Sequence, residues 1–290
     1  MHRCNRSTRS SRPCTFGAGT ASGLEVLTLG RPQLDLVVPE TIEPALRAAR
    51  PDIVVNAAAY TAVDQAEREP EVATKINRDG AGAAAAKALG VPVIHLSTDY
   101  VFDGAKRSSY VEEDRVAPAS VYEASKLAGE QAVTAACGDH VILRTAWVYA
   151  PYGKNFVRTM LALAETRDEV RVVVDQHGCP TCAADVARAI IAIAHNLLKY
   201  RSDPSPRGIF HLAGTGETSW AGFAETIFEF LARRGLRRPV LTPITSAEYP
   251  TPARRPANSR LNCAKLASMH GIELPHWQES LTTCLKRLVE

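Results

Sequence analysis

The feature that most constrains the fold is an alternation of short apolar runs with helix-favouring stretches along most of the chain. Strand-like runs are predicted at residues 24–29, 52–58, 91–97, 141–145, 170–174 and 208–212. Helices are predicted at residues 39–50, 62–89, 120–137 and 183–199. Continuous apolar strands separated by helices are typical of a parallel sheet that is buried on both faces. The pattern therefore predicts a doubly wound α/β fold of the Rossmann type.

The pattern loosens after Ala213. Two further helices are predicted at residues 220–233 and 261–269, on either side of a segment rich in proline and arginine at residues 249–260. This arrangement indicates a second, smaller lobe.

Composition excludes several classes of protein. The chain has 290 residues, of which 46% are hydrophobic and 22% charged, as in an ordinary globular protein. Its 34 basic and 31 acidic side chains are too balanced for binding driven by nucleic-acid phosphates. No apolar run reaches the length of about 18 residues that a membrane helix needs. Seven cysteines, an odd number with irregular spacing and no secretory signal, predict a reduced cytoplasmic protein. The pair Cys179 and Cys182 has the spacing of a redox or metal site, but no further ligands follow it, and packing is the favoured role.

Residues 1–22 do not fit the alternation. They read MHRCNRSTRSSRPCTFGAGTAS, without the apolar run of a first strand. Gly17, Gly19 and Gly23 are spaced one residue too widely for the G-x-G-x-x-G fingerprint of a dinucleotide-binding turn. The Arg- and Ser-rich composition, with no acid before Glu25, leaves three interpretations open: native disorder, an organelle transit peptide, or a reading-frame error in the gene. We expect this segment to form no regular strand–turn–helix and the chain to bind a dinucleotide poorly.

A hydroxyl, a tyrosine and a lysine are spaced as in a proton-transfer site. Thr98 follows a predicted strand, at the end where ligands bind in open α/β sheets. Tyr122 and Lys126 are four residues apart on a predicted helix and so share one face. A neighbouring ammonium lowers the pKa of a phenol, which lets it exchange a proton with a carbonyl or alcohol oxygen. Y-x-x-x-K alone is common on helices by chance, and the hydroxyl upstream makes the pattern specific.

With these three residues the chain resembles the extended short-chain dehydrogenases/reductases. Longer strings are similar to the dTDP-4-dehydrorhamnose reductases of that group, in order over residues 23–290. These strings are RPDIVVNAAAYTAVD at residues 50–64, STDYVFDG at 97–104, RTAWVY at 144–149, VDQHGCPT at 174–181 and YPTPARRPANSRLN at 249–262.

The resemblance implies a reaction and a domain division. NAD(P)H would reduce C4 of dTDP-4-dehydro-6-deoxy-L-mannose to give dTDP-L-rhamnose, the last step of dTDP-rhamnose biosynthesis. Tyr122 would donate the proton, Lys126 would lower the pKa of Tyr122 and bind the nicotinamide ribose, and Thr98 would orient the carbonyl. The NAD(P)-binding domain would comprise residues 1–144 plus about 165–212. The sugar-nucleotide lobe would comprise about 145–164 plus 213–275, followed by a C-terminal helix at 276–290.

The resemblance also implies which residues bind the cofactor: Arg31, Asp35, Leu36, Ala57, Ala58, Ala59, Tyr60, Thr61, Tyr122 and Lys126. Gly30 stands where an acidic residue would bind the ribose 2′-hydroxyl, and Arg31 follows it. The missing acid and the adjacent arginine favour NADPH, with NADH as the alternative. Mg²⁺ is implied by the resemblance only, and the sequence predicts no dedicated metal site.

For the sugar nucleotide, the resemblance implies binding by Thr98, Asp99, Trp147, Asn155, Gln176, Arg254 and Arg255, with Arg260 as a further candidate for the diphosphate. Two alternatives stay open: another nucleotide-sugar reductase or epimerase, and a non-catalytic NADP-binding regulatory subunit of the same fold. The expected partner is a small molecule, neither nucleic acid nor membrane, and the resemblance allows a homodimer.

Overall fold

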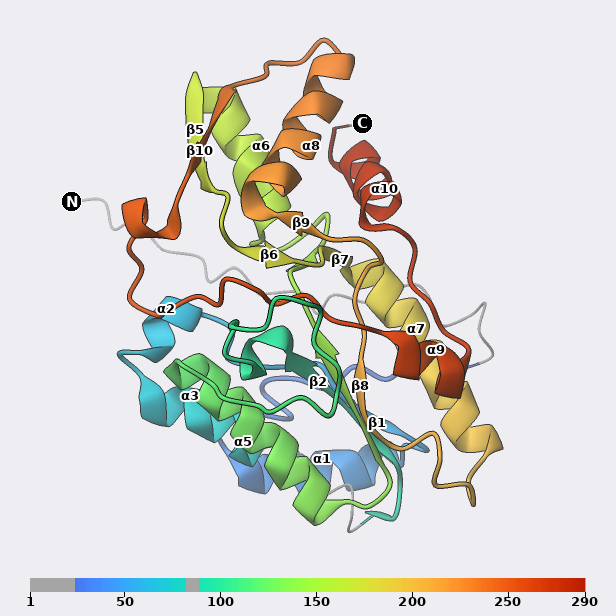
Figure 1. Cartoon of the computed structure of the whole chain (residues 1–290). Coiled ribbons are helices and arrows are strands. Elements are labelled where there is room, and N and C mark those ends of the chain that lie inside the picture. Colours follow the sequence, from blue (N-terminus) through green and yellow to red (C-terminus); the bar gives the residue numbers. More distant parts are fainter. Residues whose placement is uncertain (1–23, 82–88, 290) are drawn as a thin grey trace, which may run out of the picture.

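The computed structural model describes residues 24–81 and 89–289 (Figure 1). Within these ranges helices and strands alternate, and the chain forms a lower layer around a parallel sheet and an upper group of helices with a small sheet (Figure 1). The predictions for residues 1–22 and for the glycines of that region lie outside the described residues.

Four described strands form the central sheet in the order β1-β2-β3-β8, and all neighbours are parallel. Their bounds are β1 Val54–Asn56, β2 Val93–Thr98, β3 His140–Thr145 and β8 Gly208–His211. β1 and β8 lie within runs that the sequence predicted, and β2 and β3 each extend one residue beyond the predicted run. The parallel order confirms the predicted α/β class.

Alternate residues of the sheet face two layers of helices. Val93 and Ile142 are fully buried against α5 (Val121–Ala136). Ile94 and Val141, their neighbours along the strands, pack in a second cluster with α7 (Ala183–Lys199). Because both faces are covered, the strands are apolar at nearly every position, which is the pattern seen in the sequence.

The first predicted strand, at residues 24–29, is wrong. Residues 24–30 have no regular structure, and Leu27 is 58% exposed. A strand needs a partner edge for its backbone N–H and C=O groups. Among the described residues β1 is an edge of the sheet, and its Val55 is 44% exposed. Residues 24–30 pair neither with this edge nor with any other described strand.

The long helix predicted at residues 62–89 is shorter and broken. Its described part consists of α2 (Val63–Ala66), α3 (Pro70–Asn77) and the 3₁₀ turn η2 (Asp79–Ala81), and residues 82–88 lie outside the description. Proline at the first position of α3 explains the break, because its ring is accommodated only in the first turn of a helix.

The upper group contains a second parallel sheet, β5 (Glu169–Val173) with β10 (Val240–Ile244). β5 was counted among the alternating strands of the nucleotide-binding domain, but it pairs here instead of in the central sheet. Helices α6 (Phe156–Thr166), α8 (Trp220–Arg233) and α10 (Trp277–Val289) accompany this sheet (Figure 1). The predicted domain boundaries stay a prediction.

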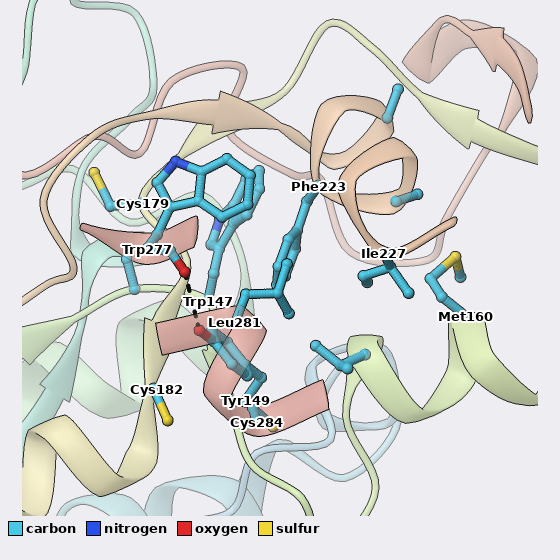
Figure 2. Close-up of a cluster of buried hydrophobic side chains, with 14 of the residues drawn as sticks. Trp147, Tyr149, Met160, Cys179, Cys182, Phe223, Ile227, Trp277, Leu281 and Cys284 are labelled. Carbon is cyan, nitrogen blue, oxygen red and sulfur yellow. Dashed lines mark hydrogen bonds between the residues drawn. The ribbon is translucent and has the colours of Figure 1, made fainter. Parts of the chain in front are cut away.

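A cluster of buried aromatic side chains fills the space between these helices (Figure 2). Tyr149 donates a hydrogen bond to the Trp277 carbonyl at 3.3 Å, and Phe223 packs edge-on against the Trp277 ring at 5.6 Å. The cluster thereby joins the segment after β3 to α8 and α10.

The remaining elements are short, apart from α1. They are η1 Pro39–Thr41, α1 Ile42–Ala49, η3 Asp99–Val101, β4 Val148–Tyr149, β6 His177–Gly178, β7 Thr181–Cys182, β9 Thr218–Ser219, η4 Ser246–Glu248 and α9 Ala264–His270. In the described part of the chain, no helix is long and apolar enough to cross a membrane.

Candidate active site

The N-terminus of α5 is fixed by three side chains. Ser120 and Glu123 form a capping box, in which each side chain accepts a hydrogen bond from the backbone N–H of the other. Glu67, which follows α2, accepts a hydrogen bond from the Val121 N–H at 2.8 Å. The first turn of α5 therefore has a defined position relative to α2.

This turn places Tyr122 and Lys126 on one face of α5, as the sequence predicted. Tyr122 is 9% exposed and packs in a cluster with Tyr60 and Tyr100. Lys126 is 3% exposed, and its Nζ donates to the Leu96 carbonyl of β2 at 2.7 Å. A side-chain hydrogen bond links Tyr122 to Thr98, the last residue of β2. The structure thus brings the three predicted residues together at the carboxyl end of the central sheet.

The pKa of Tyr122 shifts in the direction opposite to the one predicted. Burial raises it to about 12, and the hydrogen bond from Thr98 only partly offsets the effect. The cation that lowers it is Arg255, whereas the sequence predicted Lys126. Burial also lowers the pKa of Lys126 to about 8, against the field of Glu130. Tyr122 is therefore a protonated phenol throughout the neutral range, which suits a proton donor.

Several buried polar atoms on residues that end or follow β2 and β3, begin α5 or lie in residues 249–260 have no hydrogen-bond partner among the described residues. They are Asp99 Oδ2, Glu123 Oε1, Thr145 Oγ1, Trp147 Nε1 and Arg255 Nη1. Thr145 is the β3 residue paired with Thr98. Buried groups of this kind are normally satisfied, so their concentration at one end of the sheet indicates a place where a polar ligand binds.

Arg255 connects the segment at residues 249–260 to α2. Its Nη2 lies 2.8 Å from Asp64 Oδ2, and the Ala253 N–H donates to Asp64 Oδ1 at 3.3 Å. Sequence reasoning named Arg255 for the diphosphate, but the structure engages it in this ion pair beside Tyr122. Asp64 was not identified from the sequence as a site residue.

The loop at residues 57–61 follows β1, beside the carboxyl end of β2. Asn77 on α3 accepts a hydrogen bond from the Tyr60 N–H at 2.8 Å and donates to the Tyr60 carbonyl at 3.2 Å. It also donates to Ser125 on α5 at 2.9 Å. Ala57, Ala58 and Thr61 are exposed. These exposed residues lie beside the carboxyl end of β2, the end of an open α/β sheet at which dinucleotides bind.

The predicted adenine-side residues lie apart from this group. Arg31 is exposed in the turn at residues 31–33. The Asp35 carboxylate accepts from the Val37 N–H at 3.0 Å, which closes a local turn. Leu36 lies against Gly80, where a Cβ atom would come within 2.7 Å of it. No recorded contact joins these three residues to Thr98, Tyr122 or Lys126.

Trp147 lies in a tight slot two residues after β3. Its ring stacks on Trp220 with centroids 3.6 Å apart, and its backbone is left-handed with φ +47°. A Cβ atom at Gly178 would lie 2.4 Å from the Trp147 ring, so only glycine fits there. β6 and β9 pair Gly178 with Thr218, just before Trp220. The indole is thus held between two elements that are distant in the sequence.

The other residues predicted to bind the sugar nucleotide differ in whether their side chains already have partners within the protein. Asn155 caps α6, accepting from the Arg158 N–H at 3.3 Å and donating to the Ala150 carbonyl at 2.8 Å. Gln176 is buried and donates to Ser246 at 2.9 Å. Arg260 is engaged with Glu217 at 2.8 Å. Arg254 is exposed and makes no recorded ion pair with the described residues, which leaves it the most accessible of the three arginines.

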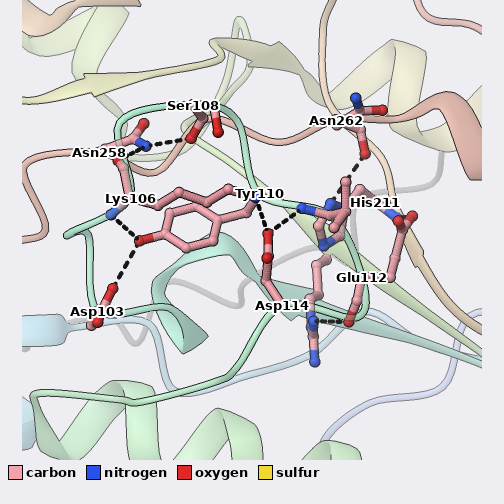
Figure 3. Close-up of polar contacts among 11 residues, drawn as sticks. Asp103, Lys106, Ser108, Tyr110, Glu112, Asp114, His211, Asn258 and Asn262 are labelled. Atoms are coloured by element: carbon pink, nitrogen blue, oxygen red, sulfur yellow. Dashed lines mark hydrogen bonds and ion pairs between the residues drawn. The ribbon is translucent and has the colours of Figure 1, made fainter.

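The loop between η3 and α5 is pinned to the segment at residues 258–262 (Figure 3). Tyr110 exchanges backbone hydrogen bonds of 2.8 Å with Arg260 and Asn262. Asn258 donates to the Lys106 and Ser108 carbonyls at 2.6 and 2.9 Å. These contacts hold residues 258–262 against the loop between η3 and α5.

Within residues 24–81 and 89–289, no group of three or more His, Cys, Asp or Glu side chains could hold a metal ion. The Mg²⁺ implied by the resemblance therefore has no support in this part of the chain. Cys179 and Cys182 are both buried free thiols, and burial raises their pKa values.

Comparison with known proteins gives a consistent result. The family model described as the RmlD substrate binding domain matches residues 16–290. The chain is 57% identical over 259 residues to a dTDP-4-dehydrorhamnose reductase of Sinorhizobium fredii, covering 89% of this chain and 87% of the relative. It is 44% identical to the enzyme of that name from Escherichia coli, covering 88% and 85%.

Solved structures agree. A dTDP-4-dehydrorhamnose reductase from Clostridium acetobutylicum superposes with a TM-score of 0.85 at 36% identity, covering 93% of each chain. One from Bacillus anthracis, solved in complex with NADP, has a TM-score of 0.83 at 34% identity, covering 91% of this chain and 90% of that one.

Proposed function

The chain belongs to the RmlD substrate binding domain family, whose named relatives are reductases of dTDP-rhamnose biosynthesis, and from this premise we propose how its own residues perform the reduction. The reaction is the NAD(P)H-dependent reduction of the C4 ketone of dTDP-4-dehydro-6-deoxy-L-mannose to dTDP-L-rhamnose. The observation that carries the residue assignment is the junction of Thr98, Tyr122 and Lys126 at the carboxyl end of β2.

Each of the three residues has one role. The bound nicotinamide supplies the hydride. Tyr122 donates the proton to the C4 oxygen, and its raised pKa keeps that proton in place until an alkoxide forms. Thr98 orients the carbonyl through its hydroxyl. Lys126 binds the nicotinamide ribose, and its hydrogen bond to the Leu96 carbonyl, beside the end of β2, supports this role.

The sugar nucleotide extends from this point toward the second lobe. Trp147 forms a wall for the sugar ring, with Asp99, Asn155 and Gln176 around it. Arg254 binds the diphosphate, because its guanidinium is exposed and has no recorded ion-pair partner. Arg255 acts beside Tyr122 through its pair with Asp64. A cytoplasmic location and a homodimer stay predictions.

The experiment that tests this function follows NADPH absorbance in the presence of the keto-sugar nucleotide and identifies the product. Equal amounts of NADP and dTDP-L-rhamnose support the proposal. A protein that binds both ligands without turnover would instead support the non-catalytic alternative.

Cofactor preference is predicted to depend on Arg31. If its guanidinium binds the 2′-phosphate, Arg31→Ala removes a charge-assisted contact of about 1.5–3 kcal/mol, roughly ten- to hundredfold in Kd. We expect the Kd of NADPH to rise by this factor and that of NADH to stay unchanged, measured by titration of cofactor fluorescence. Equal effects on the two cofactors would remove Arg31 from the site.

Cofactor affinity is also predicted to be limited by the sequence before Leu24. The pyrophosphate of a dinucleotide normally binds the N–H groups of a Gly-rich turn and helix N-terminus. We expect a version that carries an apolar strand, a G-x-x-G-x-x-G turn and a helix before Leu24 to bind NADPH at least tenfold more tightly. Tight binding by the chain as sequenced, with no gain in the grafted version, would contradict this expectation.

A further inference from the structure

Trp220 is the first residue of α8, and the proposed function gives it no role. Its ring stacks on the Trp147 ring, with centroids 3.6 Å apart and planes inclined by 6°. The same ring lies 4.6 Å from the ring of Phe156, which follows Asn155 at the start of α6. Trp220 therefore contacts both segments that are expected to line the sugar of the substrate.

The start of α8 holds Trp220 in a defined position. Ser219 caps the helix by accepting a hydrogen bond from the Gly222 N–H at 3.1 Å. One residue earlier, Thr218 pairs with Gly178 across the antiparallel strands β9 and β6. A Cβ atom at Gly222 would lie 2.4 Å from Thr218 Oγ1, so this turn is closely packed. A capped first turn that is also paired to a strand presents its side chains from a fixed base.

The orientation of the Trp147 ring depends on its neighbours. The backbone of Trp147 has φ +47°, a left-handed conformation that is unfavourable for a bulky residue and persists only where the surrounding structure holds it. The Trp147 carbonyl accepts a hydrogen bond from the Thr181 N–H at 3.3 Å, which fixes the backbone. The indole N–H has no hydrogen-bond partner in the part of the chain that the structure describes. The angle of the ring is therefore set by its packing against Trp220 and Gly178.

A change in this angle would reach the place of reduction. Thr145, the last residue of β3, pairs in register with Thr98, the last residue of β2. Only Ala146, which is fully buried, separates Thr145 from Trp147. Trp147 therefore follows the strand end that lies beside Thr98, the residue proposed to orient the C4 carbonyl. A sugar ring that packs on Trp147 takes its position relative to Thr98 from the angle of the indole.

We propose that Trp220 is a positioning residue for the sugar, which holds the Trp147 indole at the angle that the substrate requires. Trp220 acts through Trp147 and contributes to binding of the sugar, whereas the nucleotide and the diphosphate bind elsewhere. This inference rests on the proposed function, in which Trp147 forms a wall for the sugar and Arg254 binds the diphosphate. It adds a residue of the second lobe that determines how tightly the sugar is held.

The first test detects the stacked pair without a ligand. The chain has three tryptophans, and two stacked indoles give a pair of circular-dichroism bands of opposite sign in the far ultraviolet. We expect these bands to disappear in Trp220→Phe and in Trp147→Phe. Trp277→Phe is the matched control and should keep them, because the recorded ring partners of Trp277 are Phe223 and His276. Bands that persist in Trp220→Phe would show that the pair is not stacked in solution and would overturn the proposal.

The second test separates the sugar from the nucleotide. Binding of dTDP-L-rhamnose and of dTDP is measured by calorimetry, without cofactor, in Trp220→Leu and Trp220→Phe. Loss of the aromatic partner should raise the Kd of dTDP-L-rhamnose about tenfold in Trp220→Leu. The Kd of dTDP, which has no sugar to pack on Trp147, should stay within about twofold of wild type. Trp220→Phe keeps an aromatic face and should bind dTDP-L-rhamnose within about threefold of wild type.

Turnover should show the same separation. With NADPH at saturation, KM for the keto-sugar nucleotide should rise about tenfold in Trp220→Leu while kcat stays within about twofold, because a loss of uniform binding raises KM alone. A variant that were merely less folded would instead lower kcat. Phe230→Leu is the matched control, since Phe230 is also a half-buried ring of α8 and its recorded ring contact is with the Arg234 guanidinium. It should leave KM, kcat and both Kd values unchanged.

A second variant reaches the same indole without a change in α8. Gly178→Ala places a Cβ atom 2.4 Å from the Trp147 ring and forces the ring aside. We expect Gly178→Ala to weaken binding of dTDP-L-rhamnose and to spare dTDP, as Trp220→Leu does. If Trp220→Leu does not fold, unchanged binding of dTDP-L-rhamnose by Gly178→Ala would overturn the proposal.

The possible results separate this inference from the proposed function. The inference is wrong if Trp220→Leu binds dTDP-L-rhamnose as the wild type does, or if it weakens both ligands equally. If Trp147→Leu selectively weakens dTDP-L-rhamnose and Trp220→Leu does not, the proposed role of Trp147 stands and this inference alone fails. If Trp147→Leu affects neither ligand, the proposed wall for the sugar is wrong and this inference fails with it.

Discussion

Tyr122→Phe should lower kcat for reduction of the keto-sugar nucleotide by about 10²–10⁴-fold, the usual contribution of a positioned acid or base. The substitution keeps the ring that packs beside Tyr60 and Tyr100 and removes only the hydroxyl that Thr98 contacts. KM should change little, since the loss concerns a proton that moves only in the transition state. Initial rates of NADPH oxidation at several substrate concentrations measure both constants.

Tyr200→Phe is the matched control, because that ring is 45% exposed, far from Thr98 in the sequence, and lies near Lys199 at the end of α7. It should leave kcat unchanged. Tyr122 would be excluded as the proton donor if its phenylalanine variant retained kcat within about threefold of wild type.

Arg144→Met should lower the free energy of unfolding by about 3–5 kcal/mol, the effect of leaving one charge of a buried ion pair without its partner. Arg144 on β3 and Glu130 on α5 are each 3% exposed, with Nη2 and Oε2 2.8 Å apart and Nε and Oε1 3.0 Å apart. Ser97 donates to the same Glu130 carboxylate at 2.5 Å. Urea unfolding followed by circular dichroism measures the change.

Two controls make this prediction specific. Arg47→Met breaks an exposed pair with Glu43 on α1 and should cost at most about 0.5 kcal/mol. Adding Glu130→Leu to Arg144→Met removes both buried charges and should restore much of the lost stability. A loss below about 1 kcal/mol in Arg144→Met alone would show that Glu130 is not left uncompensated.

Local signals predicted three of the helices well, namely α5, α7 and α8. The predicted span of α5 differs from the observed one only by its two flanking residues, because Ser120 and Glu123 carry the capping signal in the sequence. The bounds of α7 and α8 match the prediction, since each helix presents a clear apolar face.

Strands were harder because each depends on a partner elsewhere in the chain. The run at residues 170–174 has the same apolar character as the central strands, and nothing local shows that it pairs with β10. The run at residues 24–29 shows how β-propensity without an adjacent edge yields no strand.

The residues of the site also fall into those that a local pattern reveals and those that depend on distant contacts. The spacing of Tyr122 and Lys126 is local and could be read from the sequence, as could a hydroxyl at a strand end. Asn77 and Asp64 act through contacts with Tyr60 and Arg255, and no spacing rule reveals such contacts. The direction of the Tyr122 pKa shift was missed because it depends on burial, which exists only in the folded chain.

The most direct test of the account follows the hydrogen that reaches the sugar. The chain and, in a parallel sample, its grafted version are each incubated with the keto-sugar nucleotide and deuterated NADPH. The deuterium is at the position on C4 of the nicotinamide from which hydride is transferred, and the grafted version ensures cofactor binding. The account predicts dTDP-L-rhamnose with one deuterium at C4 of the sugar for each NADP formed, and none from Tyr122→Phe within the same time. Product without deuterium at C4, or an epimerised sugar formed without oxidation of NADPH, would contradict it.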